Sequence, residues 1–316
     1  MENLAYSLNA TAPVFLVIIL GYILRQIGVL DDHFTSVCNK FNFKITLPVM
    51  LYMQMTENNV KEHFSGGFVL LCAVITTVSI AFCWLFARLT LKDHHMVGAF
   101  AQSSFRGSVA VLGMALVTNI YGSASVVPAM MVGSVTLYNV FAVLILTLEG
   151  PKDVQENWKA SMVKSVKSIV TNPLILAILI GLFVSWFQIQ LPVVLERSLG
   201  YVSDLGMPQA LICIGAGFQG AEAIKKIRPT LAATFIKLVL LPGLALPVCA
   251  FLGIRGEYLA AILVMQGSPS TSTGYVMVKS MGGDDVLASG TVVATTALSA
   301  FTLTFWVFLA RQLGLL

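Results

Sequence analysis

The chain has 316 residues, of which 57% are hydrophobic and only 11% are charged, and its mean hydropathy is +0.86. Soluble domains carry about 25% charged residues, so this composition excludes an ordinary water-soluble domain and predicts an integral membrane protein. The net charge of +4 does not indicate nucleic-acid binding, because the basic residues form no long run interleaved with aromatic residues. We therefore expect the lipid bilayer as a partner, and no nucleic acid.

Apolar stretches predict ten transmembrane helices, since each crossing of a bilayer needs about 20 mostly apolar residues. The first stretch, Leu8 to Ile27, is preceded by Glu2 and by no lysine or arginine, which is typical of a retained span and not of a secretory signal. The spans are expected at residues 8–27, 35–56, 65–89, 95–120, 123–148, 168–188, 191–219, 229–252, 255–280 and 285–311.

A polar connection near the middle of the chain, Glu149 to Lys167, divides these spans into two sets of five. Residues 1–150 are expected to form the first five-helix repeat, residues 151–167 a linker, and residues 168–316 the second repeat. An odd number of spans in each half makes the second half enter the membrane from the opposite side. The predicted architecture is all-α, with two inverted five-helix repeats.

Internal spacing supports this repeat. Pro13 and Pro48 are 35 residues apart, and Pro173 and Pro208 are also 35 residues apart, in a chain with only 11 prolines. The same offset of 160 relates Gly21 to Gly181 and Gly122 to Gly282.

Lysine and arginine residues are distributed unevenly between the loops, and an excess of them marks the cytoplasmic side. Twelve lie on the side reached after odd-numbered spans: Arg25, Lys40, Arg88, Lys92, Lys152, Lys159, Lys164, Lys167, Lys225, Lys226, Arg228 and Lys279. Four lie on the other side: Lys61, Arg197, Arg255 and Arg311. We expect a multi-pass protein of the cell membrane with both termini outside and the linker in the cytoplasm.

Polar residues interrupt two of the apolar spans, at residues 102–108 in the fourth and at residues 266–274 in the ninth. Glycine loosens a helix and proline lacks an N–H. A broken backbone persists in a membrane only where it is buried in protein or lines a wet cavity. We therefore predict that helices four and nine are broken and meet at one site near the middle of the membrane.

This site is expected to bind an anion, because broken helices expose N-termini with partial positive charge. Arg106 adds a guanidinium that can hold a carboxylate in bidentate fashion. Arg106 could instead pair with an acid or extend to the interface, and the hydroxyls near Pro269 could bond back to helix carbonyls. The predicted substrate-binding residues are Gln102, Ser104, Arg106, Gly107, Ser108, Asn139, Gln266, Ser268, Pro269, Ser270 and Thr271.

Three further charges lie inside apolar spans. Lys44 and Asp204 are related by the offset of 160. Asp204 is a candidate for proton coupling, and a permanent ion pair with Lys44 is the alternative. Lys237 has no evident partner in the sequence, and we expect a structural or snorkelling role for it.

Short motifs occur along the chain in a definite order. They are Leu47-Pro48, Phe105-Arg106-Gly107-Ser108, Leu112-Gly113-Met114-Ala115-Leu116, Tyr121-Gly122, Leu137-Tyr138-Asn139-Val140, Lys237-Leu238, Leu241-Pro242, Gln266 to Pro269, Met281-Gly282-Gly283 and Leu287-Ala288-Ser289. As a set, these motifs resemble the auxin efflux carrier family, which includes plant PIN proteins and bacterial malate and malonate permeases. The resemblance covers essentially the whole chain.

The resemblance implies a ten-helix fold in which broken helices four and nine cross at the site and one subdomain moves like an elevator against a scaffold. It also implies that helices one, two, six and seven form the scaffold and the contact of a homodimer. The chain departs from the family at Ser108, where similar proteins commonly have Asn, and at Ala115, where they commonly have Pro. These departures predict a softer crossover in helix four.

The leading expectation is a secondary transporter of a small organic anion, such as malate, malonate or an auxin-like acid, with possible proton or sodium coupling and no cofactor. A cation/proton antiporter or a sodium-coupled symporter on a similar fold is the alternative, although Asp31-Asp32 and Asp284-Asp285 lie at loops or helix starts. A channel or a ligand-sensing receptor would have the same hydropathy, so hydropathy does not distinguish these two classes from a transporter.

An enzyme is not expected, because the four histidines lie near loops and no nucleophile or metal cluster accompanies them. The five cysteines show no metal-ligand spacing either.

Overall fold

The structure, a computed structural model, describes residues 2–57, 66–122, 124–150, 171–218 and 220–316, and within them the side chains other than those of residues 2–11 and 110–115. All regular structure in these ranges is helical, which confirms the predicted all-α class. The predicted linker, residues 151–167, lies outside the described residues.

The elements follow one another along the chain with short connections. They are α1 (Glu2–Gln26), α2 (Asp32–Phe41), η1 (Asn42–Thr46), α3 (Leu47–Glu57), α4 (Gly66–Thr90), α5 (His94–Phe105), α6 (Val109–Tyr121), α7 (Val127–Glu149), α9 (Pro173–Trp186), α10 (Val193–Ala216), α11 (Gly220–Lys225), α12 (Ile227–Phe235), η2 (Ile236–Leu240), α13 (Leu241–Phe251), α14 (Gly256–Gly267), α15 (Ser272–Ser280) and α16 (Asp285–Gln312).

Four helical stretches of the described chain are long and apolar enough to cross a membrane unaided: α4, α7, the continuous stretch Ile227–Phe251 and α16. Two shorter apolar helices cover Ala12–Gln26 and Pro173–Trp186. The predicted fourth and ninth spans are each divided into two helices, α5 with α6 and α14 with α15, so the predicted breaks are confirmed.

The second and eighth predicted spans contain π-helical turns, which were not predicted from the sequence. η1 ends two residues before Pro48, and η2 ends two residues before Pro242. A proline inside a helix removes one hydrogen bond, and its ring crowds the carbonyl four residues earlier. A wider π turn relieves that crowding while the helix continues.

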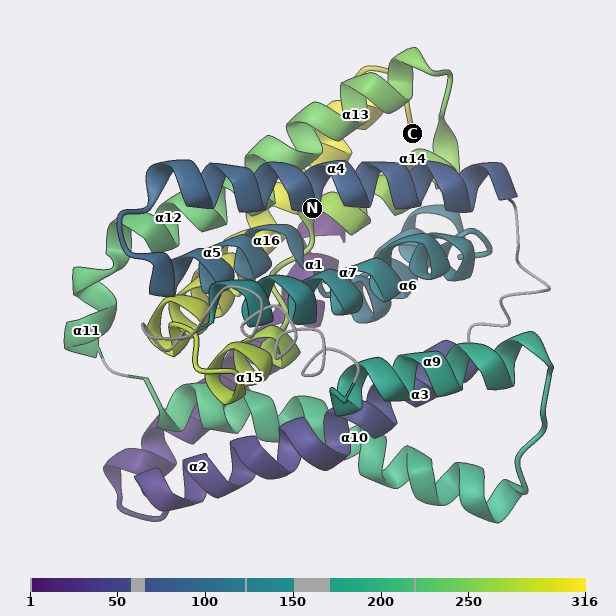
Figure 1. Cartoon of the computed structure of the whole chain (residues 1–316). Helices are drawn as coiled ribbons and strands as arrows, with labels where there is room; N and C mark the ends of the chain where they lie inside the picture. The colour runs from purple at the N-terminus through teal and green to yellow at the C-terminus, as the bar shows by residue number, and fades with distance from the viewer. Residues whose placement is uncertain (1, 58–65, 123, 151–170, 219) are drawn as a thin grey trace, which may run out of the picture.

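The helices form two groups (Figure 1). α2, α3, α9 and α10 lie side by side in the lower part of the view, where α3 packs against both α9 and α10. α4, α5 and α7 lie in the layer above and pack against one another. α16 packs against α5 of this layer, and α1 contacts both α16 and α10 of the first group, so α1 connects the two groups.

Glycines let helices of the lower group approach closely. A methyl group on Gly215 of α10 would overlap the carbonyl oxygen of Ile18 in α1 and lie 2.8 Å from the amide nitrogen of Tyr22. A methyl group on Gly21 would likewise overlap the backbone of α10, and one on Gly181 of α9 would lie 3.0 Å from the carbonyl oxygen of Tyr52 in α3. Small residues permit such backbone contacts between membrane helices.

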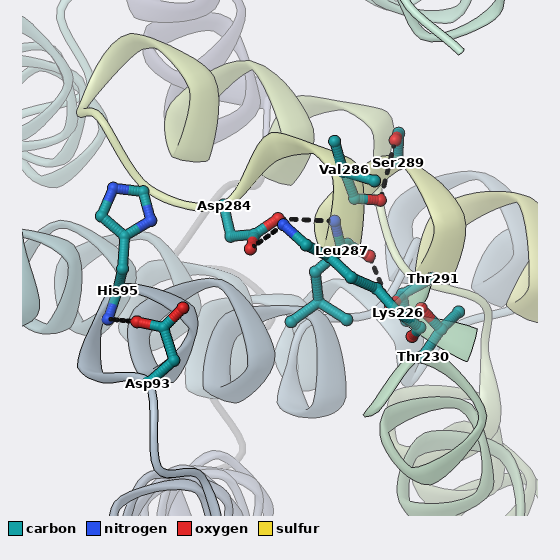
Figure 2. A network of polar contacts seen from close by, with 9 residues as sticks. All are labelled: Asp93, His95, Lys226, Thr230, Asp284, Val286, Leu287, Ser289 and Thr291. Carbon is teal, nitrogen blue, oxygen red and sulfur yellow. Dashed lines mark hydrogen bonds and ion pairs between the residues drawn. The ribbon is translucent and has the colours of Figure 1, made fainter. Parts of the chain in front are cut away.

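The starts of α5, α12 and α16 meet at one end of the bundle (Figure 2). Asp93 accepts a hydrogen bond from the amide of His95 at 3.0 Å, and Asp284 accepts one from the amide of Leu287 at 2.9 Å. Lys226 Nζ lies 2.5 Å from Asp284 Oδ2 and joins α12 to α16. Carboxylates satisfy free N–H groups at helix N-termini, so this end of the bundle anchors three helices that start together.

We predict that Gly215→Ala destabilises the protein, because the added methyl group meets rigid backbone. Overpacking of this kind costs about 2 kcal/mol, which would lower the melting temperature in detergent by about 5 °C. Gly200→Ala is the matched control on the same helix, since nothing lies within 4 Å of its added methyl group. Equal melting temperatures for the two variants would contradict the close approach of α1 and α10.

Candidate functional site

Two extended segments interrupt the helices at the centre of the fold. α5 ends at Phe105 and α6 begins at Val109, while α14 ends at Gly267 and α15 begins at Ser272. Arg106 and Ser268, the first residues beyond the ended helices, both have extended backbone angles. α5 and α6 have 12 and 13 residues, or about 18 and 20 Å at 1.5 Å per residue. The break therefore lies near the middle of the predicted fourth span.

The residues around both breaks are shielded from solvent and lipid. Every residue of α5 from Val97 to Phe105 is buried, and so is every residue of α14 from Leu259 to Gly267. The same holds from Ser272 to Val278 in α15. This burial in protein is what permits irregular backbone at membrane depth.

The two breaks are hydrogen-bonded to each other. The Ser108 amide donates to the Pro269 carbonyl at 2.8 Å, and the Ser270 hydroxyl donates to the Ser103 carbonyl. The Thr271 hydroxyl caps α15 by accepting from the Gly274 amide at 3.2 Å. α6 begins without a side-chain cap, so the N-terminal amides of its first turn have no side-chain partner at Ser108.

Arg106 is 5% exposed and is held by neutral partners. Its Nη2 donates to Asn139 Oδ1 at 2.6 Å and to Thr273 Oγ1 at 3.1 Å, and its Nη1 lies 2.8 Å from Met277 Sδ. No ion pair with an acid is formed by Arg106 within the described part of the chain. Three of the five guanidinium N–H donors are thus used, and the positive charge is not neutralised.

A cavity of about 160 Å³ lies against the two breaks and Arg106. Its polar wall consists of Arg106, Gly107, Ser108, Asn139, Pro269, Ser270, Thr271, Ser272, Thr273 and Thr296. Its other wall is largely apolar and comes from α1, α3 and α10, through Val14, Met50, Gln54, Met207 and Leu211. The cavity thus lies between the lower group of helices, together with α1, and the broken helices.

Seven of the eleven predicted substrate-binding residues line this cavity: Arg106, Gly107, Ser108, Asn139, Pro269, Ser270 and Thr271. The other four, Gln102, Ser104, Gln266 and Ser268, are buried outside its lining. Gln102 Nε2 donates to the Gly274 carbonyl at 2.8 Å, and the Ser104 hydroxyl donates back to the Phe100 carbonyl at 2.7 Å. Both support the crossing and do not face the cavity.

Several lining residues were not among those predicted from the sequence. Thr273 belongs to the hydroxyl-rich run after Pro269 and could have been included on that ground. Thr296 of α16 and Gln54 of α3 come from helices without a break. Nothing in the sequence placed them beside Arg106.

Lys44 and Asp204 both have exposed side chains, on η1 and α10. No ion pair joins them in the described part of the chain, so the predicted permanent pair is not formed in this structure. Neither residue lines the cavity. The role of Asp204 in proton coupling stays a prediction.

Lys237 does have partners, but they are backbone carbonyls. Its side chain is fully buried on η2, and Nζ donates to the carbonyls of Phe105 at 3.2 Å and Met265 at 3.4 Å. A snorkelling position is therefore excluded. The structural role expected for Lys237 is consistent with these bonds.

Known proteins are similar to this chain over nearly its whole length. An uncharacterized transporter of Methanothermobacter thermautotrophicus is 21% identical over 95% of this chain and 97% of its own length. A Rhizobium meliloti protein, provisionally named a malonate transporter, is 22% identical over 95% of this chain and 94% of its own. The uncharacterized transporter YfdV of Escherichia coli K12 is 20% identical over 98% of this chain and 99% of its own length.

A family model described as "Membrane transport protein" matches residues 6–307. The match covers nearly the whole chain and confirms the resemblance to the auxin efflux carriers. The several apolar helices agree with it, since a transporter of this kind passes the membrane more than once. The chain is a multi-pass membrane protein and belongs to the membrane transport protein family of the auxin efflux carriers.

Proposed function

We propose that the protein is a secondary transporter that carries a small organic anion, a carboxylate, across the cytoplasmic membrane through the cavity beside Arg106. The observation that carries this proposal is a buried guanidinium without an acidic partner in the described chain, at the wall of a cavity. A buried charge is costly unless it is paired. A carboxylate in the cavity would supply the missing partner.

The remaining geometry favours an anion over a cation. Two N–H groups of Arg106, one on Nη1 and the one on Nε, are not used by described residues, and they suit a two-oxygen acceptor. The cavity also borders the N-termini of α6 and α15, where partial positive charge and free amides attract anions. A cation/proton antiporter would need acidic groups here, and the described lining contains none.

Size limits the substrate to a small acid. An engineered apolar cavity of ~150 Å³ in another protein accommodates benzene, and this cavity is of about 160 Å³. A dicarboxylate with a short carbon chain has the right dimensions. The name of the Rhizobium meliloti relative, which refers to malonate, agrees with this class of substrate.

We further propose two inverted repeats and an elevator movement. Gly21 and Gly181, which are 160 residues apart, mediate two separate close contacts, α1 with α10 and α9 with α3. The cavity lies between those helices and the broken ones, so a shift of the broken helices past the largely apolar wall would carry the site across the membrane. The proposed orientation has both termini outside, and the proposed assembly is a homodimer.

The transport assignment can be tested directly in proteoliposomes. We expect saturable uptake of one or more small mono- or dicarboxylates, measured with imposed pH and sodium gradients in turn. Uptake of a metal cation or of no acid in the panel would contradict the proposal. Flux that does not saturate would indicate a channel.

We predict that Arg106→Ala reduces the efficiency of uptake by about 100-fold, because charge-assisted hydrogen bonds contribute about 1.5–3 kcal/mol. Arg106→Lys should reduce the efficiency of uptake by about tenfold, since lysine keeps the charge but not the planar, two-pronged guanidinium. Arg311→Ala, at an exposed position near the end of α16, is the control and should transport normally. If the Arg106→Ala variant is folded and takes up the acid with normal affinity, Arg106 does not bind the substrate.

We predict that Leu211→Ala shifts selectivity towards acids with a longer apolar portion, because Leu211 is 3% exposed and lines the apolar wall. One methylene in an apolar pocket changes selectivity by about tenfold or more. Competition by a series of acids of increasing chain length measures the shift. Leu205→Ala, on the exposed face of the same helix, should leave the preference unchanged; an equal shift in both variants would contradict the position of the cavity.

A further inference from the structure

Lys237 is a second buried cation, and the anion site does not use it. Its side chain has 0% exposure and lies outside the residues that line the cavity. Its ammonium donates to the carbonyls of Phe105 and Met265, at 3.2 and 3.4 Å. No ion pair with a carboxylate is formed by Lys237 in the described chain. Helix carbonyls are therefore the groups that stabilise its charge.

These two carbonyls lie at the C-terminal ends of broken helices. Phe105 is the last residue of α5, and Met265 lies two residues before the end of α14. The final carbonyls of a helix lack partners within it and carry partial negative charge. In transporters with broken helices, such ends coordinate monovalent cations. The ammonium of Lys237 occupies the position between these carbonyls at which such an ion would bind.

The surroundings are rich in oxygen and tightly packed. The Tyr138 hydroxyl donates to the same Met265 carbonyl at 3.1 Å. The Ser268 hydroxyl is fully buried and has no hydrogen-bond partner among the described residues. A methyl group on Gly107 would lie 3.0 Å from Lys237 Nζ and would overlap the Ser268 hydroxyl. The unpartnered Ser268 oxygen is therefore a further potential ligand for a cation at this position.

We propose that a monovalent-cation site lies where the C-terminal ends of α5 and α14 meet and that the tethered ammonium of Lys237 occupies it. The protein consequently binds no sodium there. A dissociable ion would be repelled by the ammonium and would compete for the same carbonyls. The consequence for transport, uptake without sodium at this site, rests on the proposed function. The cation site itself does not.

The first test uses the wild-type protein in detergent. Its melting temperature is measured while sodium chloride replaces choline chloride at constant ionic strength. We expect a change of less than about 1 °C, because the site is already filled. A saturable, sodium-specific rise of about 3 °C or more would show an open sodium site and overturn the proposal.

The second test empties the site by Lys237→Ala. n-Propylammonium restores the atoms that this substitution removes, and ammonium restores the charge alone. We expect the variant to melt at a lower temperature than wild type and to regain about 3 °C or more with either ion, but not with choline. Absence of rescue by all the cations would overturn the proposal.

Lys44→Ala is the matched control, since Lys44 lies on the other π turn, η1, with an exposed side chain. It should show no rescue by propylammonium; rescue equal to that of Lys237→Ala would indicate a general salt effect and overturn the assignment.

Two further variants keep the test decisive if Lys237→Ala does not fold. Lys237→Met removes the charge and keeps the length of the side chain, so it should be destabilised, while Lys237→Arg should remain folded. A Lys237→Met variant as stable as wild type would show that no cation is needed and would overturn the proposal. None of these measurements depends on transport, so failure of uptake would affect the proposed function alone.

Discussion

Helix ends that lie inside an apolar bundle impose the main constraint on this fold, because their free amides and carbonyls have no water to bond to. The crossing of α5 and α6 with α14 and α15 satisfies that constraint by pairing one break with the other, through the Ser108 amide and the Pro269 carbonyl. The surrounding helices then bury both segments. The cavity and its polar wall lie against this pair of breaks.

The polarity of the helices explains why two cations are placed so differently. Helix N-termini border the cavity, where Arg106 adds a guanidinium that has no acidic partner in the described chain, and the proposed anion would complete the charge balance. Helix C-termini contact Lys237, whose compact ammonium bonds to two carbonyls. An arginine suits the first position because its fork fits a carboxylate, and a lysine suits the second because a point charge fits converging carbonyls.

Much of this arrangement could be predicted from the order of residue types. Long apolar runs predicted the helices, and Arg106 and Pro269 inside such runs predicted the breaks, because hydropathy and the backbone effect of proline are local properties. The π turns before Pro48 and Pro242 were missed, although the same proline effect causes them. An ion pair between Lys44 and Asp204 was one of two alternatives suggested by their opposite charges at positions 160 residues apart, and both side chains turn out to be exposed.

The sequence by itself determined the helical class, the two breaks and the presence of a positive charge within an apolar span, because each depends on neighbours within a few residues along the chain. Only the tertiary structure decided which residues surround that charge. Thr273, Gln54 and Thr296 reach the cavity from three separate helices, and Lys237 finds its partners 132 and 28 residues away. Such contacts depend on how helices pack, and packing is a property of the whole bundle.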